Sequence, residues 1–169
     1  SLLAADYSQI ELRIMASLSK DKSLLEAFKN GEDIHSATAA KVYRVKLGDV
    51  TREMRSKAKA VNFGIIYGIS PFGLSQNIGV SRSEAKEIIE NYFMEFPEIK
   101  EYMNQTIQNA KKNEYVETLM GRRRYLKDIN SSNSVVRSVA ERNAINTPIQ
   151  GLAADIIKKA MIEIQNELE

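Results

Sequence analysis

The sequence has no cysteine, a single histidine and no long apolar run. The absence of cysteine excludes disulfide bonds, thiolate zinc sites and a cysteine nucleophile, and it is compatible with a reducing cytoplasm. No stretch reaches the roughly 18 apolar residues that a membrane-spanning helix needs, and the N-terminal SLLAADYSQ has no basic region followed by an apolar one. The sequence therefore predicts no membrane partner and no signal peptide.

Charge of one sign is also scarce, since 24 Lys and Arg residues nearly balance 22 Asp and Glu residues. Bulk charge therefore does not indicate a nucleic-acid partner, and local clusters have to make that case. A length of 169 residues with 43% hydrophobic content suits about one domain with a core of its own. The chain opens on an apolar SLLAA and closes in the helical pattern IIKKAMIEIQNELE, so both ends are expected to lie inside a larger protein.

Hydrophobic periodicity predicts a mainly α-helical fold with a short strand at 2–6. A helix is expected from Ser8, with Glu11 completing a capping box, followed by short helices near 22–29 and 34–43. A longer helix is expected over 51–67, capped by Asp49 or Thr51. No internal linker is evident, which predicts one piece or two tightly packed subdomains.

The second half of the chain is also predicted to be mostly helical. SPFGLSQNIG predicts a turn and a short helix, Ser81 with Glu84 forms a second capping box, and Pro97 suits the first turn of the next helix. YVETLMGRRRYL predicts a β-hairpin around its glycine. A long helix is expected from about residue 134 to the C-terminus, interrupted and kinked by Pro148 and Gly151.

The segment RSKAKAVNFGIIYG, residues 55–68, places Arg55, Lys59, Phe63 and Tyr67 four residues apart. Each such step turns only about 40° around a helix, so the four side chains form one slanting stripe. For this helix taken alone, a solvated cationic end joined to a buried aromatic end is the simpler interpretation. The functional interpretation is a phosphate clamp beside a stacking platform, because the cations suit phosphate oxygens and the rings suit stacking on bases. The glycines at 64 and 68 weaken the helix and suggest that a ligand or another chain approaches its backbone.

Two further segments carry weaker signals. In DYSQIELR, Asp6 ends the predicted strand, a common position for a metal ligand, and Glu11 lies close behind. Both acids could instead serve only in a turn and a capping box. His35, near a helix start, is either structural or a hydrogen-bond donor to an anion.

Candidate nucleic-acid contacts lie toward the C-terminus. GRRRY, residues 121–125, is the densest positive cluster and suits DNA phosphates, although a solvated turn explains it equally well. Arg142, Asn146 and Gln150 repeat every four residues on the last helix, with side chains suited to base edges and sugars. Without further context they describe a polar helix face.

The order and separation of DYSQIELR, RSKAKAVNFGIIYG, GRRRY and RNAINTPIQGLAADIIK resemble family A DNA polymerases of the DNA polymerase I type. The resemblance covers essentially the whole chain. It implies a mainly α-helical piece of an α+β parent, comprising the fingers and part of the palm. Residues 1–20 would form a palm strand and helix with motif A, residues 21–115 the fingers, and residues 116–169 a hairpin and a long helix returning to the palm.

The resemblance implies a role for each matching residue. Asp6, with the carbonyl of Tyr7, would hold paired Mg²⁺ ions that activate a primer 3′-hydroxyl. Glu11 would exclude a 2′-hydroxyl and thereby select deoxynucleoside triphosphates. Gln9 and His35 would contact the triphosphate.

The remaining implied roles lie on the two long helices. Arg55 and Lys59 would hold the triphosphate, with Lys59 a general acid for the leaving pyrophosphate. Phe63 would pack on the incoming sugar and base, and Tyr67 would occupy the template side. The primer–template DNA would be contacted by Arg122, Arg123, Arg142, Asn146 and Gln150. Family members with Tyr in place of Phe63 accept dideoxynucleotides readily, so this Phe predicts their rejection.

The sequence departs from the family pattern by omission. A His-Asp-Glu turn with the second catalytic aspartate does not occur, since the single His is followed by Ser36. The resemblance implies that the parent is a cytoplasmic, template-directed DNA polymerase. Because the second catalytic aspartate is missing, this segment alone is expected to be inactive or nearly so. A single-subunit RNA polymerase is an alternative that Phe63 and Glu11 argue against. A non-catalytic nucleotide- or DNA-binding module is the other.

Overall fold

The computed structural model describes residue 4 and residues 6–168, which form eight α-helices, one short 3₁₀ helix and one β-hairpin. The predicted strand at 2–6 lies largely outside the described residues. The helices are α1 (Ile10–Ser19), α2 (Lys22–Lys29), α3 (Ile34–Val42), η1 (Leu47–Asp49), α4 (Arg52–Ile66), α5 (Pro71–Ile78), α6 (Arg82–Glu95), α7 (Pro97–Asn113) and α8 (Ser134–Leu168). The strands are β1 (Tyr115–Glu117) and β2 (Arg123–Tyr125). The mainly α-helical prediction is confirmed.

Side-chain caps fix where several helices begin. Thr51 accepts from the N–H of Met54 to start α4, and Ser81 accepts from the N–H of Glu84 to start α6, both as predicted. The predicted capping box at Ser8 is wrong. Helix α1 begins instead after Gln9, which has a left-handed backbone with φ of 57° and makes no side-chain cap.

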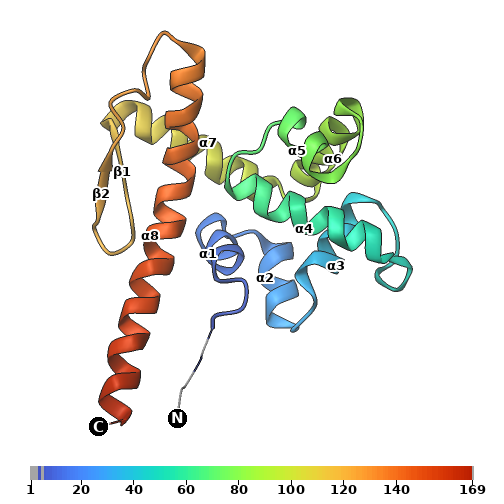
Figure 1. Cartoon of the computed structure of the whole chain (residues 1–169), viewed down its shortest axis with the longest axis horizontal. Coiled ribbons are helices and arrows are strands. Elements are labelled where there is room, and N and C mark those ends of the chain that lie inside the picture. The colour runs from blue at the N-terminus through green and yellow to red at the C-terminus, as the bar shows by residue number, and fades with distance from the viewer. Residues whose placement is uncertain (1–3, 5, 169) are drawn as a thin grey trace.

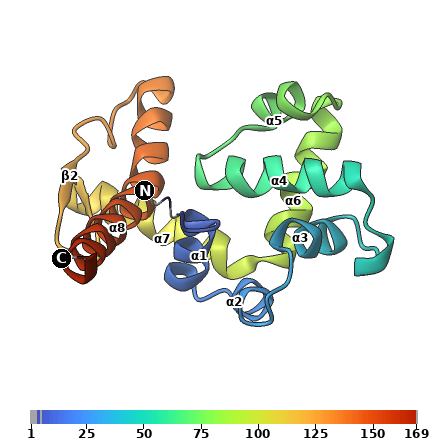
Figure 2. The same cartoon turned by 60° about the horizontal axis from the view of Figure 1, so that its bottom comes forward.

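The main core joins α1 to α7 with the middle of α8. Its largest fully buried members include Leu12, Met15, Tyr92, Phe96 and Ile149. In Figure 1, α4 lies in the right-hand group of helices, with α5 above it and α3 below it. Figure 2, turned by 60°, shows the opposite flank, where α1, α7 and the hairpin gather around α8.

The hairpin has its own small core against α7 and α8. β1 and β2 pair antiparallel, with Val116 opposite Arg124, and Val116 packs among buried residues that include Leu126, Ala140 and Ala144. Gly151 lets the hairpin approach α8, since a Cβ there would lie 2.5 Å from Cγ2 of Thr118.

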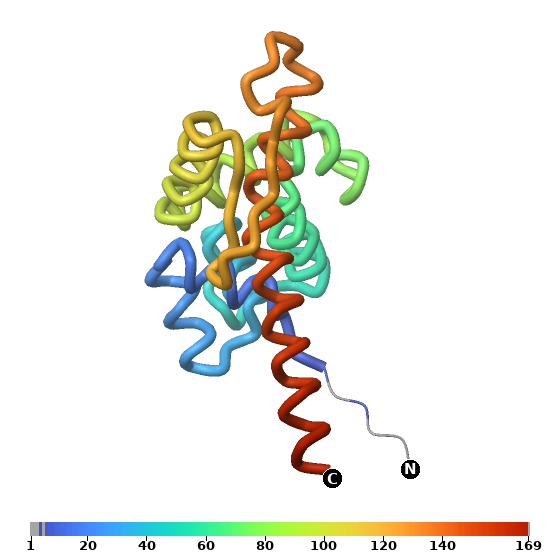
Figure 3. Tube along the Cα trace, turned by 90° about the vertical axis from the view of Figure 1, so that its left-hand side faces the viewer, coloured from blue at the N-terminus to red at the C-terminus, as the bar shows by residue number. Residues whose placement is uncertain are grey.

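Helix α8 is continuous from Ser134 to Leu168. The interruption predicted at Pro148 and Gly151 does not occur. Proline removes one backbone hydrogen bond of the helix, and burial of Pro148 and Ile149 compensates for that loss. The C-terminal turns of the helix project beyond the rest of the molecule (Figure 3). This end exposes the apolar side chains of Met161 and Ile162. None of the helices in the described part of the chain has the length and apolar character needed to cross a bilayer.

Candidate functional site

The stripe predicted on the 55–68 segment lies along one face of α4. Lys59, Phe63 and Tyr67 line a groove of about 580 Å³ whose other walls include Asn77, in the last turn of α5, and Arg142 of α8. Lys59 is exposed and Phe63 is half-buried. The groove thus places a free cation beside aromatic surface, which suits an anionic ligand that carries a ring.

Arg55, at the start of the stripe, is held by an acid that the sequence analysis did not single out. Its guanidinium donates to both carboxylate oxygens of Asp33, at 3.0 and 2.7 Å. Asp33 also caps α3 by accepting from the N–H of Ser36 at 2.7 Å. The Arg55 guanidinium keeps the pKa of Asp33 well below its usual range. Because the pair is largely exposed, Arg55 can exchange this partner for a phosphate at little cost.

His35 lies beneath the stripe rather than at its surface. Its ring is 3% exposed and its centroid lies 5.8 Å from that of Phe63. Nε2 is 3.5 Å from the side-chain amide nitrogen of Gln9, and Nδ1 is 3.1 Å from Nδ2 of Asn62. Burial lowers the pKa of His35, and the charges of Arg55 and Lys59 lower it further against an opposing effect of Asp33. The ring is therefore neutral at physiological pH.

The far end of the stripe is connected to motif-A residues by a hydrogen bond. The Tyr67 hydroxyl donates to Oε2 of Glu11 at 2.8 Å, across 56 residues of sequence. This bond raises the pKa of Tyr67, burial adds to the effect, and the side chain of Gln150 opposes it. Three residues predicted to act at one site, from α1, α4 and α8, therefore meet around one hydroxyl group.

Gly64 and Gly68 do not leave the α4 backbone open to a ligand, as the sequence suggested. A Cβ at Gly64 would lie 2.7 Å from Cγ2 of Ile69, and one at Gly68 would lie 2.6 Å from Cγ of Arg142. Gly68 also has φ of 66°, which a side chain rarely adopts. The glycines admit side chains of the same chain, and Gly68 lets Arg142 enter the groove wall.

Asp6 and Tyr7 are exposed and line a separate hollow of about 310 Å³ with Ile157, Met161 and Ile164 of α8. Within the described residues, no group of three or more His, Cys, Asp or Glu side chains is arranged to hold a metal ion. One carboxylate offsets the repulsion between two divalent cations poorly. The residues of this chain alone therefore do not fit a two-metal centre.

The arginines of GRRRY are engaged within the chain. Arg122 donates to the carboxylate of Asp155 on α8, and Arg123 donates to that of Glu117 across the hairpin while stacking 4.7 Å over the Tyr115 ring. Both side chains remain about half exposed. The structure thus gives these arginines a structural role in addition to the predicted contact with DNA.

The polar face of α8 is only partly brought to the groove. Arg142 lines it and Gln150 contacts Tyr67. Among the described residues, the Oδ1 of Asn146 is buried and has no hydrogen-bond partner.

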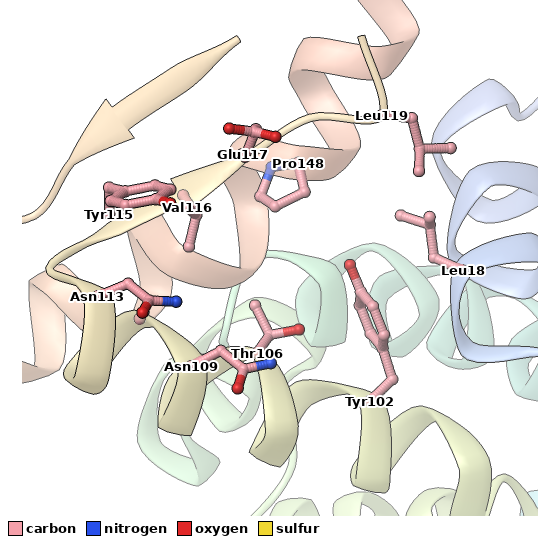
Figure 4. Close-up of a pocket in the computed structure, with 11 residues that line it drawn as sticks. Leu18, Tyr102, Thr106, Asn109, Asn113, Tyr115, Val116, Glu117, Leu119 and Pro148 are labelled. Atoms are coloured by element: carbon pink, nitrogen blue, oxygen red, sulfur yellow. The ribbon is translucent and has the colours of Figure 1, made fainter. Parts of the chain in front are cut away.

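A further hollow of about 400 Å³ lies between α7, β1 and α8. Figure 4 shows Tyr102, Thr106, Asn109 and Asn113 along α7, with Pro148 on the other side. None of the predicted site residues lines it, and Glu117 is its only ionisable acid or base apart from tyrosines. We assign no function to this hollow.

Sequence reasoning missed Asp33, Thr38 and Asn62. Thr38 and Asn62 are fully buried and hydrogen-bonded to each other at 3.1 Å. A signal was present for Asn62, because a polar residue inside the otherwise apolar run VNFGII has to find a buried partner.

Comparisons with known proteins agree with the motif resemblance. Residues 1–169 match the family described as DNA polymerase family A. DNA polymerase I of Geobacillus stearothermophilus is 58% identical over 167 residues, which cover 99% of this chain and 19% of that protein. DNA polymerase I of Bacillus subtilis (strain 168) is 56% identical over 168 residues, again covering 99% of this chain and 19% of that protein.

Among solved structures, the fold is similar to the POL domain of Pol1 from M. smegmatis, determined in complex with DNA primer-template and dNTP. The TM-score is 0.90 and the sequence identity 48%, with 96% of this chain and 29% of that chain covered. The chain therefore spans about one fifth of the length of these curated relatives.

Proposed function

Because this chain belongs to DNA polymerase family A, we propose that it is the nucleotide-binding part of a DNA-directed DNA polymerase. The observation that carries the proposal is the groove on α4, where Lys59, Phe63 and Tyr67 converge with Arg142. One of the similar proteins named above was solved with primer-template DNA and dNTP, which supports the same kinds of ligand for this chain.

In this proposal, the incoming deoxynucleoside triphosphate lies along α4. Lys59 and Arg55 neutralise the phosphates, and Lys59 gives a proton to the leaving pyrophosphate. Phe63 packs against the sugar and base, while Tyr67 lies at the template side. Gln9 and His35 contact the triphosphate from below the stripe.

Sugar selection and DNA contact are assigned to the residues around the Tyr67 hydroxyl. Glu11 lies within hydrogen-bond distance of that hydroxyl, so its position is fixed and a 2′-hydroxyl would meet it. Arg142, Asn146 and Gln150 contact the primer–template near its growing end. Arg122 and Arg123 contact the DNA backbone with the donor groups that their ion pairs leave free.

The proposed subdivision is a palm portion at 1–20, the fingers at 21–115, and a hairpin with a long helix returning to the palm at 116–169. The separate small core of the hairpin supports the boundary before residue 116, while the main core joins α1 to α7 with the middle of α8. In the complete polymerase, Asp6 and the Tyr7 carbonyl would contribute to a Mg²⁺ site whose other carboxylates lie outside this chain. Mg²⁺ would there activate the primer hydroxyl and stabilise pyrophosphate.

The alternative of a single-subunit RNA polymerase is not favoured, since the matched family and the named relatives are DNA polymerases. We propose a bacterial cytoplasmic location for the parent.

A primer-extension assay tests the proposal. The complete polymerase should add dNTPs to a primer, and Asp6→Asn should abolish the addition. This chain alone should give none. Asp6-dependent extension by this chain, or normal extension by the Asp6→Asn polymerase, would overturn the assignment.

A further inference from the structure

Three buried polar side chains form a hydrogen-bonded series beneath the stripe on α4. Thr38 and Asn62 are 0% exposed and His35 is 3% exposed. They are joined in series, with Thr38 bonded to Asn62 and Asn62 bonded to His35. Because buried polar groups are costly unless they are paired, this arrangement fixes the direction of each hydrogen bond.

The directions follow from the donors available. Thr38 has one hydroxyl proton, and its shortest acceptor is the carbonyl oxygen of Ile34 at 2.8 Å. Its oxygen then accepts from Nδ2 of Asn62 at 3.1 Å, and Oδ1 of the same amide lies equally close to it, at 3.1 Å. Thr38 therefore pairs with the amide of Asn62, and the contact of Nδ2 with the ring sets the direction. The second hydrogen on Nδ2 points to Nδ1 of His35, also at 3.1 Å. Nδ1 is therefore an acceptor, and a neutral imidazole with an accepting Nδ1 carries its proton on Nε2.

The other side of the ring faces a replaceable partner. Nε2 lies 3.5 Å from the Gln9 amide, at the outer limit of a hydrogen bond, and rotation of that amide by about 180° presents its oxygen to the ring. Gln9 has a left-handed backbone with φ of 57°, which is uncommon for a residue with a side chain. An anion can therefore replace a weakly held amide without disturbing the core.

We propose that Asn62 is a positioning residue that holds His35 as the neutral Nε2–H tautomer, so that the ring donates to a phosphate oxygen of the incoming nucleotide. The phosphate part rests on the proposed function, whereas the tautomer is a property of the unliganded chain. The charged groups around the ring are Asp33 on α3 and Arg55 and Lys59 on α4. The two cations supply the charge neutralisation, and the histidine supplies direction.

His35 is the only histidine of the chain, so its imidazole nitrogens can be observed without assignment. Nitrogen NMR of the chain labelled with ¹⁵N-histidine should show a protonated Nε2 and an unprotonated Nδ1 at neutral pH. A protonated Nδ1, or an equal mixture of tautomers, would overturn the proposal without any substitution.

Three variants test the cause. Asn62→Asp replaces the donor with an acceptor and should move the proton to Nδ1. Thr38→Val removes the hydroxyl that pairs with the Asn62 amide, which leaves that amide freer to rotate, and should raise the Nδ1–H population, whereas the matched Thr38→Ser retains the hydroxyl and should leave the spectrum unchanged. A wild-type tautomer in the folded Asn62→Asp chain would overturn the role of Asn62. Thermal unfolding establishes which variants are folded.

Kinetics of the complete polymerase test the link to the nucleotide. Asn62→Leu should lower kcat/KM for dNTP by about tenfold, the range of one hydrogen bond to a charged group. In a His35→Ala background the same substitution should change it less than about twofold, because the donor is already lost. If His35→Ala has no effect while the spectrum is as expected, the nucleotide contact fails and the tautomer assignment stands.

Discussion

The hydroxyl of Tyr67 donates a 2.8 Å hydrogen bond to the carboxylate of Glu11. The two residues lie 56 positions apart, one at the end of α4 and the other in the first turn of α1. This bond joins the residue assigned to the template side to the residue assigned to sugar selection. A nucleotide that moves one of them therefore affects the other.

We expect Glu11→Gln to lower the pKa of Tyr67 toward its ordinary value. The carboxylate raises this pKa because it favours the protonated phenol, and a neutral amide does so far less. The pKa is measured by NMR of ¹³C-tyrosine, with the signal identified by its absence in Tyr67→Phe. An unchanged pKa of Tyr67 would contradict the bond. Since Tyr67 is 41% exposed, the unfolding free energy should fall by at most about 1 kcal/mol.

The contact between the hairpin and α8 gives a stability prediction. Gly151→Ala should lower the free energy of unfolding by about 1–3 kcal/mol, because the new Cβ would overlap Cγ2 of Thr118. Thr118→Ser removes that methyl group and keeps the hydroxyl that accepts from the N–H of Arg122. The double variant should therefore recover most of the loss in urea unfolding. Equal losses in the single and double variants would show that the overlap is not the cause.

Asp21 should make the chain less stable as pH rises. Burial raises its pKa to about 6, proximity to Glu98 adds to the effect, and the hydrogen bond from the N–H of Leu24 opposes it. Between the unfolded value of 3.8 and about 6, the folded state binds more protons than the unfolded state, so its stability falls through this window. Asn retains the cap and carries no charge, so Asp21→Asn should be more stable than wild type above pH 6, by about 2 kcal/mol.

Asp33→Asn is the matched control with the opposite sign. Both aspartates cap helices, but the pKa of Asp33 is lowered by Arg55. Its contribution is present above the unfolded pKa and is lost as pH falls, so Asp33→Asn should be less stable than wild type at neutral pH. Urea unfolding from about pH 4 to 7 should show the Asp21→Asn difference growing with pH and the Asp33→Asn difference staying nearly constant, because Asp33 titrates below its unfolded pKa of 3.8. If both substitutions changed the free energy of unfolding in the same direction near pH 7, the causes assigned to the two pKa shifts would be refuted.

Phe63 should make the complete polymerase reject dideoxynucleotides. Phe63→Tyr adds a hydroxyl group beside the position assigned to the sugar and should raise the kcat/KM for ddNTP relative to dNTP by about tenfold or more. Chain-termination assays at matched ddNTP and dNTP concentrations measure this ratio. Unchanged termination would mean that Phe63 does not face the sugar.

Local chemistry made much of the fold predictable. Thr51 and Ser81 cap helices where the sequence places them, and Pro97 starts α7. Ser8 fails as a cap because Gln9 adopts a left-handed backbone and directs its amide to His35, 26 residues away. Local spacing carries no information about such a distant partner.

The sequence predicted the residues of the candidate site but not the pairings that the structure shows among them. The four-residue spacing on α4 indicated the stripe, and the structure brings Glu11 and Gln150 to its end. The partners of Arg55 and Arg122 are acids 22 and 33 residues away. Because ion pairs across a fold depend on tertiary packing, spacing alone could not reveal them.

The central claim is that the groove on α4 binds the triphosphate. The most direct measurement is single-turnover dNTP incorporation by the complete polymerase carrying Lys59→Ala, with Lys57→Ala as the control. Lys57 lies on the same helix, rotated by about 200°, and pairs with Glu53 at 2.9 Å. We predict a loss of about tenfold or more in kcat/KM for Lys59→Ala and less than about twofold for Lys57→Ala. Equal effects of the two substitutions would contradict the account.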